Sequence, residues 1–320
     1  DKEATASAQE KLERLKEMFN EWIWQDEERR TVLGRMYNDL FNTTVKKVHD
    51  GKNLTIDGLN NVTLRPHQLD AIAMLINNKG GIIDHIVGAG KTYVMIAAAI
   101  KMKQIGMANK PTIIGLKSTI PHLVEDAKNA FPNAKILTPT ESDFSAKNRK
   151  KFLSKIQNND WDLIIMSHEQ FGSIPQDNGV QIEAINEEIE LLDQEFENAQ
   201  DDGSPASKAA LKGLEKRKEN LQTKLQELLD APKDAEILNF KQIGIDHLMV
   251  DESQMFKNLE YATKINRIAG LGNKNGSKRA FNMLIAARTL QKMYNGDKGV
   301  TFSSGTVISN SLVEMYLLFK

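Results

Sequence analysis

The sequence contains no cysteine, which excludes disulfide bonds, thiolate nucleophiles and cysteine-based zinc sites. It has no apolar run long enough to span a membrane and no stretch with the pattern of a signal peptide. Positive charge is not in excess either, because 42 Lys and Arg stand against 43 Asp and Glu. Without a global positive field, any binding of nucleic acid depends on local groups. We therefore expect a cytoplasmic protein with no membrane partner.

What the sequence does have is the composition of a globular chain, with 40% hydrophobic and 27% charged residues over 320 positions. This length fits one large domain with attachments, or two domains. The chain starts at Asp1, and it ends at Lys320 within an apolar run of helical spacing. We interpret it as a fragment of a longer protein.

Residues 1–59 are predicted to form an N-terminal helical segment. Two apolar stripes recur at steps of three and four, the first including Leu12, Leu15 and Phe19 and the second Met36 and Leu40. The simplest interpretation is a helical support that packs on the next domain. The alternative is a platform on which bases stack, using Trp22 or Trp24.

From residue 60 onward, short apolar runs alternate with helical stretches. Strand and helix in alternation predict a parallel sheet covered by helices on both faces. Strands are expected at residues 81–87, 111–116, 135–137, 161–166, 245–250 and 299–303, and helices at 92–104 and 120–130.

Residues 180–232 interrupt this alternation. Two long segments carry apolar residues at helical steps, and Asp-Asp-Gly-Ser-Pro at residues 201–205 separates them with a turn signal. The pattern predicts an inserted antiparallel helical hairpin with a coiled-coil-like seam. Its role is open between a strut or dock for another part of the protein and a lever that touches nucleic acid.

The most informative segment is an apolar run from Gly81 that leads into Gly88-Ala89-Gly90-Lys91-Thr92 and then a helix. Glycines let backbone N–H groups close around phosphate oxygens, and the start of the helix adds its positive end. Lys91 can reach the β and γ phosphates of ATP, and the Thr92 hydroxyl can ligate Mg²⁺. We predict a phosphate-binding loop that includes Gly88 and Gly90.

A second apolar strand, residues 247–250, ends in two carboxylates. Ligands of parallel sheets lie beyond the carboxyl ends of the strands, so Asp251 is expected to face the Mg²⁺ held by Thr92. Glu252 can orient or deprotonate the water that attacks the γ-phosphate. With Lys91, this pair forms the predicted catalytic set.

These segments belong to an ordered set that resembles the first RecA-like lobe of superfamily-two helicases, nearest to the Swi/Snf-type ATPases. The set spans about residues 62–312. It comprises Leu-Arg-Pro-His-Gln-Leu-Asp-Ala-Ile at 64–72, the phosphate loop, Pro-Thr-Ile-Ile at 111–114 with Lys117-Ser118, Ser-His-Glu-Gln-Phe at 167–171, Asp-Glu-Ser-Gln-Met-Phe-Lys-Asn at 251–258, and Ser-Gly-Thr-Val-Ile-Ser-Asn at 304–310.

The resemblance implies a role for each of these motifs. Arg65 and Gln68 belong to the nucleotide-recognition motif, with Gln68 as the adenine reader. The residues implied to contact the nucleic-acid backbone are Lys117, Ser118, Ser167 and His168, and those implied to couple hydrolysis to movement are Gln254, Ser304, Gly305 and Thr306. The implied partners are DNA, duplex more than single-stranded, and a second RecA-like lobe. That lobe would supply transition-state arginines, so this fragment alone is expected to be nearly inactive.

Three residues depart from the family pattern. Gln254 stands where the family has the His that links the nucleotide site to the coupling motif. Val307 replaces Pro in that motif, and His85 replaces the small residue that opens the phosphate loop. A looser likeness to methylase-linked helicases of phages and conjugative elements rests on the helical leader and the His85 form of the loop.

Three functions remain open on this basis. The first is a lobe of an ATP-dependent DNA translocase, as in a methylase-linked or restriction-type system. The second is a helicase that acts on RNA or separates strands. The third is a degenerate lobe kept as a docking scaffold, which Gln254 and Val307 favour and which the retained Lys91, Thr92 and acidic pair oppose.

Overall fold

The computed structural model describes residues 2–42, 47–202, 205–230, 238–259, 276–296, 298–306 and 312–319. The chain divides into two compact units, Asp1–Val48 and His49–Lys320. The domain boundary predicted at residues 59 and 60 stays a prediction. Val307 of the coupling motif lies outside the described residues, as does the side chain of Trp24.

The first unit consists of two helices, α1 (Lys2–Gln25) and α2 (Glu27–Phe41). Asp26 separates them because its carboxylate accepts a hydrogen bond from the Arg29 backbone N–H at 2.7 Å and so caps α2. The Arg29 guanidinium lies 3.7 Å from the centre of the Trp22 ring, a cation–π contact. The predicted apolar stripes are present, but their large side chains are exposed.

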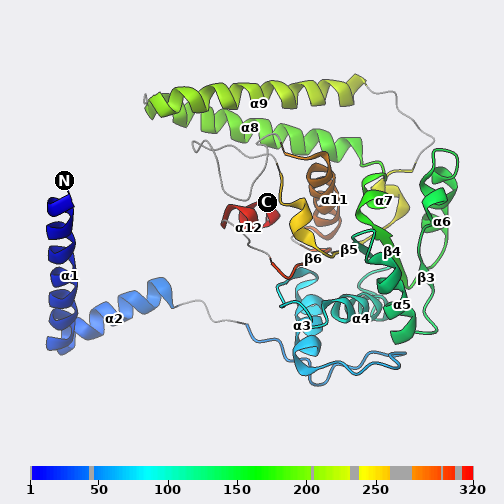
Figure 1. Ribbon diagram of the computed structural model, residues 1–320, viewed down its shortest axis with the longest axis horizontal. Helices are drawn as coiled ribbons and strands as arrows, with labels where there is room; N and C mark the ends of the chain where they lie inside the picture. The colour runs from blue at the N-terminus through cyan, green and yellow to red at the C-terminus, as the bar shows by residue number, and fades with distance from the viewer. Residues whose placement is uncertain are drawn as a thin grey trace. The chain divides into compact units, whose positions relative to one another are not determined.

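The second unit is built on a six-stranded sheet in which every pair of neighbours is parallel (Figure 1). The strand order is β1-β6-β5-β2-β4-β3. The strands are β1 (Gly81–Ile83), β2 (Pro111–Gly115), β3 (Ile136–Leu137), β4 (Leu163–Ser167), β5 (His247–Val250) and β6 (Val300–Ser303). This order places β6 between β1 and β5, which carry the phosphate loop and the acidic pair.

Helices cover both faces of this sheet because successive strand residues point to opposite sides. One core includes Ile113 and Met249 and packs against α3 (Pro66–Asn78), α4 (Lys91–Gln104) and α5 (Ile120–Ala130). The other includes Ile114 and Leu248. It packs against α6 (Arg149–Asn158), α7 (His168–Gly172), α10 (Phe240–Ile243) and α11 (Lys278–Tyr294). The predicted α/β class, a parallel sheet with helices on both faces, is confirmed.

The strand predicted at residues 81–87 is too long. Strand β1 ends at Ile83, and the chain leaves the sheet at Asp84. Ile86 and Val87 extend the apolar run in the sequence, yet 79% and 84% of their surfaces are exposed. The run of apolar residues therefore continues into the predicted phosphate loop, where these residues are exposed and not buried.

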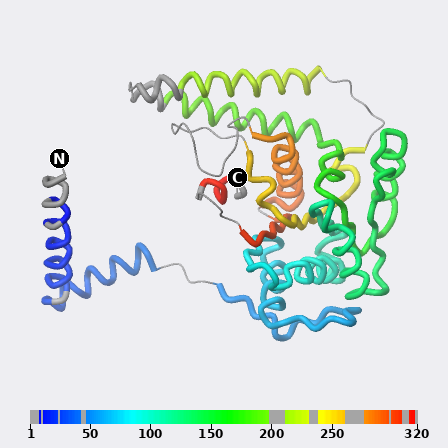
Figure 2. Tube along the Cα trace, in the orientation of Figure 1, coloured from blue at the N-terminus to red at the C-terminus, as the bar shows by residue number. Residues whose placement is uncertain are grey.

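The predicted helical hairpin is present as α8 (Asn178–Asp202) and α9 (Pro205–Asp230), which run side by side (Figure 2). Ile185, Leu192, Leu214 and Leu221 form its buried seam. The buried Arg217 adds an ion pair to Glu188 at 2.8 Å. Helix α11 supports the hairpin, since Phe281 packs against this seam.

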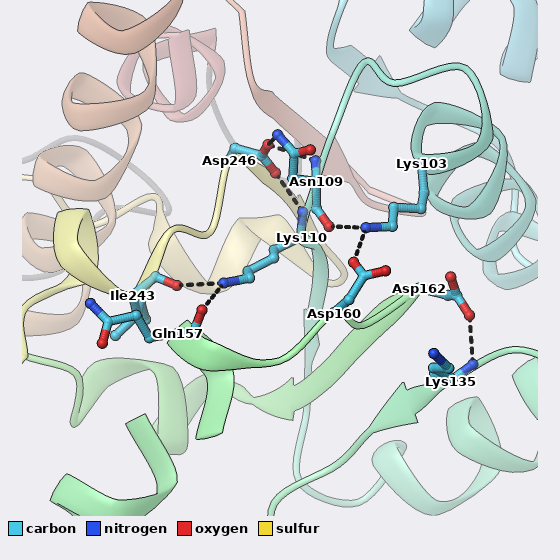
Figure 3. A network of polar contacts seen from close by, with 9 residues as sticks. All are labelled: Lys103, Asn109, Lys110, Lys135, Gln157, Asp160, Asp162, Ile243 and Asp246. Carbon is cyan, nitrogen blue, oxygen red and sulfur yellow. Dashed lines mark hydrogen bonds and ion pairs between the residues drawn. The ribbon is translucent and has the colours of Figure 1, made fainter. Parts of the chain in front are cut away.

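The amino ends of the strands are joined by a polar network (Figure 3). The buried Asp246, just before β5, accepts hydrogen bonds from the backbone N–H groups of Asn109 and Lys110 at 2.6 and 2.8 Å. Lys103 bridges the Asn109 carbonyl and Asp160. These bonds hold β2 and β5 in register at the edge of the sheet opposite to the motif residues.

Candidate nucleotide-binding site

The sequence motifs meet at the carboxyl edge of the sheet. The phosphate loop follows β1, the acidic pair follows β5, and Ser304 to Thr306 follow β6 between them. The same edge carries Lys117 and Ser118 beyond β2, and Ser167 at the end of β4. In open parallel sheets, this is the edge at which ligands bind.

The phosphate loop turns back on itself before α4 begins at Lys91. Gly88 and Gly90 have φ angles of +84° and +81°, a conformation that residues with side chains rarely adopt. The Lys91 ammonium donates hydrogen bonds to the carbonyl oxygens of His85 at 2.8 Å and Ile86 at 3.2 Å. Thr92 is half-buried in the first turn of α4. The ammonium is therefore held at the centre of the loop.

Gln68 connects the predicted nucleotide-recognition motif to this loop. Its Oε1 accepts a hydrogen bond from the Arg65 backbone N–H at 2.7 Å, and its Nε2 donates to the carbonyl oxygens of Ala89 and Gly90 at 3.2 and 3.3 Å. The side chain is buried, with 6% of its surface exposed, whereas Arg65 is exposed. Residue Gln68 thus lies against the loop.

Two histidines that sequence reasoning did not place together lie beside the loop. The His67 and His85 rings meet edge to face with their centres 5.5 Å apart, and His67 Nε2 lies 3.1 Å from the Ala89 carbonyl oxygen. Burial, together with His67 and Lys91, lowers the pKa of His85 below its usual value. Residue 85 is therefore neutral at pH 7 and adds no charge to the loop.

Asp251 is a carboxylate whose ionised form is disfavoured by its surroundings. Burial and the adjacent Glu252 carboxylate raise its pKa, while the Glu252 backbone N–H and the charge of Lys91 partly oppose the rise. A bound cation would relieve this desolvation. The effect of Lys91 on the pKa also indicates that the phosphate loop and the acidic pair lie close together.

Gln254 joins the acidic pair to the coupling motif. Its Nε2 donates a hydrogen bond to the Glu252 carboxylate, and its Oε1 accepts one from the Ser304 hydroxyl at 2.7 Å. The Ser304 hydroxyl in turn accepts from the Thr306 backbone N–H at 3.0 Å. Glu252 itself adopts a left-handed backbone conformation with φ of +51°. The structure thus places glutamine in the bridging position implied for histidine.

Gly305 brings the coupling motif against the phosphate loop. A Cβ atom at Gly305 would lie 3.0 Å from Val87 Cγ2 and 3.4 Å from Lys91 Nζ. A side chain at residue 305 would therefore have to displace the Val87 side chain by a few tenths of an ångström. The two segments are therefore in direct contact.

A second connection, which sequence reasoning missed, ties the acidic segment to α12 (Leu312–Phe319). The Lys257 ammonium lies 2.8 Å from the carboxylate of Glu314, which is fully buried. Lys257 belongs to the quoted acidic motif, but nothing in the sequence marks Glu314 as its partner. Helix α12 follows the coupling motif, so the pair fastens the segment beyond that motif to the acidic box.

Lys117 and Ser118 are exposed beyond β2, as a contact with nucleic acid requires. The Lys117 ammonium pairs with the Glu141 carboxylate at 2.5 Å, and this bond raises the pKa of Lys117. The Lys117 and Glu141 side chains are both mostly exposed to solvent, so their ion pair is weak and another anion can replace the carboxylate.

Ser167 and His168 are placed differently from Lys117. The buried Ser167 hydroxyl accepts a hydrogen bond from the Gln170 backbone N–H at 3.2 Å and caps α7. His168 is 1% exposed, and its Nε2 lies 2.9 Å from the Asp251 carbonyl oxygen. Because both side chains are buried, contact of either with a nucleic-acid backbone would require a change of conformation. In this conformation they support the acidic segment.

The residues present fit a magnesium ion bound together with a nucleotide. Within the described part of the chain, no group of three or more His, Cys, Asp and Glu side chains could hold a metal by itself. Mg²⁺ in nucleotide sites is held by one or two protein groups plus the substrate phosphates. Asp251 and Thr92 are groups of the required type.

No helix among the described residues combines the length and the apolar character that a membrane span needs.

These features define an α/β protein with a candidate phosphate loop and an acidic pair at one edge of its sheet. The family model described as "Probable helicase domain" matches residues 73–320, and the chain belongs to this family. A second model, described as a domain of unknown function, matches residues 1–43. No curated protein matches the chain.

Among solved structures, the chain is similar to one described as "Sulfolobus solfataricus SWI2/SNF2 ATPase core in complex with dsDNA". The identity is 12%, the TM-score is 0.40, and the match covers 83% of this chain. The chain spans about a third of that structure, 36% of its length.

Proposed function

We propose that this chain is the ATP-binding lobe of an ATP-dependent DNA translocase or helicase, in which hydrolysis of ATP is coupled to movement on DNA. The observation that carries the proposal is the meeting of the phosphate loop, the acidic pair and the coupling motif after three neighbouring strands. Such an arrangement supports phosphoryl transfer, which depends mostly on positioning and charge neutralisation.

Each group at this edge has a role in the proposal. Lys91 leaves the carbonyl oxygens of its own loop and binds the β and γ phosphates of ATP. Thr92 and Asp251 would hold Mg²⁺, which when bound neutralises charge on the phosphates. Glu252 orients the attacking water, and the hydrogen bond from Gln254 fixes its carboxylate.

The contact made by Gln254 weighs against the scaffold alternative. Gln254 in place of the family's histidine would favour a degenerate lobe if it broke the link between the nucleotide site and the coupling motif. Gln254 bonds both Glu252 and Ser304, so its amide supports the same link. A pure scaffold has no physical need for such a connection.

The DNA-facing part of the proposal rests on the exposed end of β2. We propose that Lys117 and Ser118 contact the backbone of duplex DNA. Glu141 forms an ion pair with Lys117 until a DNA phosphate replaces it. We further propose a second RecA-like lobe as a partner and a methylase-linked or restriction-type system as the setting. The last proposal is supported only by the form of the leader and loop.

Fluorescence anisotropy of a labelled duplex and a labelled single strand tests this part. Glu141→Gln is expected to tighten duplex binding about two- to threefold, because it frees Lys117 from a weak surface pair. Lys117→Ala is expected to weaken binding, and Glu141→Gln in that background to have no further effect. If neither DNA binds at low salt, with or without an ATP analogue, the DNA-facing proposal is wrong.

A further inference from the structure

A cluster of positive charge lies at the start of α6. The stretch from residue 147 to 155 contains no acidic residue, and its cations are Lys147, Arg149, Lys150, Lys151 and Lys155. The whole chain, by contrast, has a net charge of −1. The apolar side of α6 packs into the core, and the lysines of the stretch are exposed. A charged outer face is often only solvated, so its place in the fold decides what it can bind.

Helix α6 starts at the edge of the sheet that carries the motif residues. The Arg149 guanidinium donates a hydrogen bond to the Ser173 carbonyl oxygen at 3.4 Å, directly after α7. At the other end of α6, the Gln157 carbonyl oxygen accepts a hydrogen bond from the Lys110 ammonium, just before β2 (Figure 3). The first turn of α6 therefore lies at the carboxyl ends of the strands and its last turn at their amino ends.

The segment that precedes α6 connects the cluster to Lys117. It contains the short 3-10 helix η1 (Glu141–Phe144), whose Glu141 forms the ion pair with Lys117. The Pro139 carbonyl oxygen accepts a hydrogen bond from Gln170 at 3.4 Å, which ties the same segment to α7. In the sheet, β4 alone separates β3 from β2, so the ends of β2 and β3 are about 10 Å apart. The cluster and Lys117 thus share one edge.

We propose that Lys147 and Lys151 bind phosphates of the same DNA duplex that Lys117 and Ser118 contact. This inference rests on the proposed function and extends the DNA-binding surface from the end of β2 to the start of α6. A duplex carries one phosphate charge per about 1.7 Å of its axis, twice the density of a single strand. It also holds these charges at fixed spacing, as the sheet holds the lysines.

Anisotropy titrations of a labelled duplex with the 320-residue chain, at a series of salt concentrations, test the inference. Each lysine that neutralises a phosphate releases counterions, so it steepens the dependence of affinity on salt. The double variant Lys147→Gln, Lys151→Gln should reduce the slope of log affinity against log salt by about 1 to 2. It should weaken binding about tenfold or more at about 0.1 M salt. Both side chains are exposed, so thermal unfolding should match that of the wild type.

The matched control is the double variant Lys135→Gln, Lys241→Gln, which removes the same charge from two other exposed lysines. Lys135 directly precedes β3. Lys241 lies on α10, whose Ile243 carbonyl oxygen accepts a hydrogen bond from Lys110 at 3.4 Å, near the amino end of β2. This variant should keep the affinity and the salt slope of the wild type. Equal losses in the two double variants would show that total charge sets the affinity, and would overturn the inference.

The remaining outcomes separate this inference from the proposed function. If the Lys147 and Lys151 variant keeps its affinity and slope while Lys117→Ala still weakens binding, the inference is wrong and the proposed function stands. A loss seen with a labelled single strand but not with the duplex would also contradict it, since the cluster is assigned to a duplex. If the wild type binds no DNA at low salt, this inference and the DNA-binding part of the proposed function both fail.

Discussion

The Ser304 hydroxyl donates a hydrogen bond to Gln254 Oε1 at 2.7 Å, which joins the segment after β6 to the segment after β5. The Gln254 amide can do this because it accepts at one atom while donating to Glu252 from the other. A neutral imidazole also has one donor and one acceptor. The two residue types are therefore equivalent in this bridge, although they differ in shape.

Loss of this bridge is expected to slow hydrolysis more than it weakens binding. Gln254→Leu removes the amide that orients Glu252 but leaves Lys91 and Thr92 in place. The hydrolysis rate should fall about tenfold or more, with the affinity for ATP nearly unchanged. Single-turnover measurements with protein in excess over ATP resolve such a difference even when turnover is slow.

Two further variants separate the bridge from a general disturbance. Gln254→His should retain most of the rate, because it restores a donor and an acceptor. Ser304→Ala should slow hydrolysis less than Gln254→Leu and add little in the double variant, because both changes break the same contact. Fully additive effects would show that the two residues act separately.

Asp251→Asn is expected to stabilise the protein at neutral pH and to abolish the effect of Mg²⁺ on ATP binding. The folded pKa of Asp251 is raised above its usual 3.8, so ionisation costs stability that grows as the pH rises from 3.8 and is complete once the pH exceeds the folded pKa. The gain from the variant should therefore disappear as the pH falls toward 3.8. Thermal unfolding across this range measures it, and a variant less stable than wild type at pH 7 would contradict the account.

A buried histidine sets a second pH dependence. Burial lowers the pKa of His247 to about 4, and its Nε2 lies 3.1 Å from Thr301 Oγ1. Between about pH 6.5 and 4 the unfolded chain takes up a proton that the folded chain does not, so stability falls as the pH drops. The expected loss is about 3 kcal/mol over the window, at about 1.4 kcal/mol per pH unit.

Urea unfolding at a series of pH values measures this loss. His247→Gln has no titrating side chain, so its stability should depend less steeply on pH within the same window. Equal slopes for the variant and wild type would show that other groups cause the acid sensitivity.

The network at the amino ends of the strands should contribute to stability and not to binding. Asp246→Ala leaves the backbone N–H groups of Asn109 and Lys110 without their acceptor, at a cost of about 2–4 kcal/mol. Asp162→Ala is the matched control, because Asp162 accepts from one backbone N–H, that of Lys135. Its cost should be about 1 kcal/mol. If Asp246→Ala folds but binds ATP much more weakly, the two edges of the sheet are not independent.

The sequence predicted the sheet and the hairpin because both follow from apolar periodicity. The seam of Ile185, Leu192, Leu214 and Leu221 could be predicted from helical spacing alone. Periodicity failed at Ile86 and Val87, where an apolar run continues after the strand has ended. Burial is a property of the tertiary fold, and a run of apolar residues cannot show where the chain leaves the sheet.

The candidate site could be predicted as a set of motifs but not as a set of contacts. The link from residue 254 to the coupling motif was implied by the family resemblance alone, although its atoms were not. The order of elements brings Lys257 to Glu314, and the sequence does not contain that order. The burial of His168 was missed for the same reason. Its ring packs against Phe256, which comes from a segment far away in the chain.

Isothermal titration of ATP into the chain, with and without Mg²⁺, tests the central claim most directly. The account predicts binding that Mg²⁺ strengthens. Lys91→Ala should weaken it roughly tenfold to a hundredfold, as expected for a charged hydrogen bond to phosphate. Lys101→Ala, in the last turn of the same helix, should bind as wild type does. Absence of ATP binding by the wild type, or equal binding by the Lys91→Ala variant, would contradict the assignment of this edge as a nucleotide site.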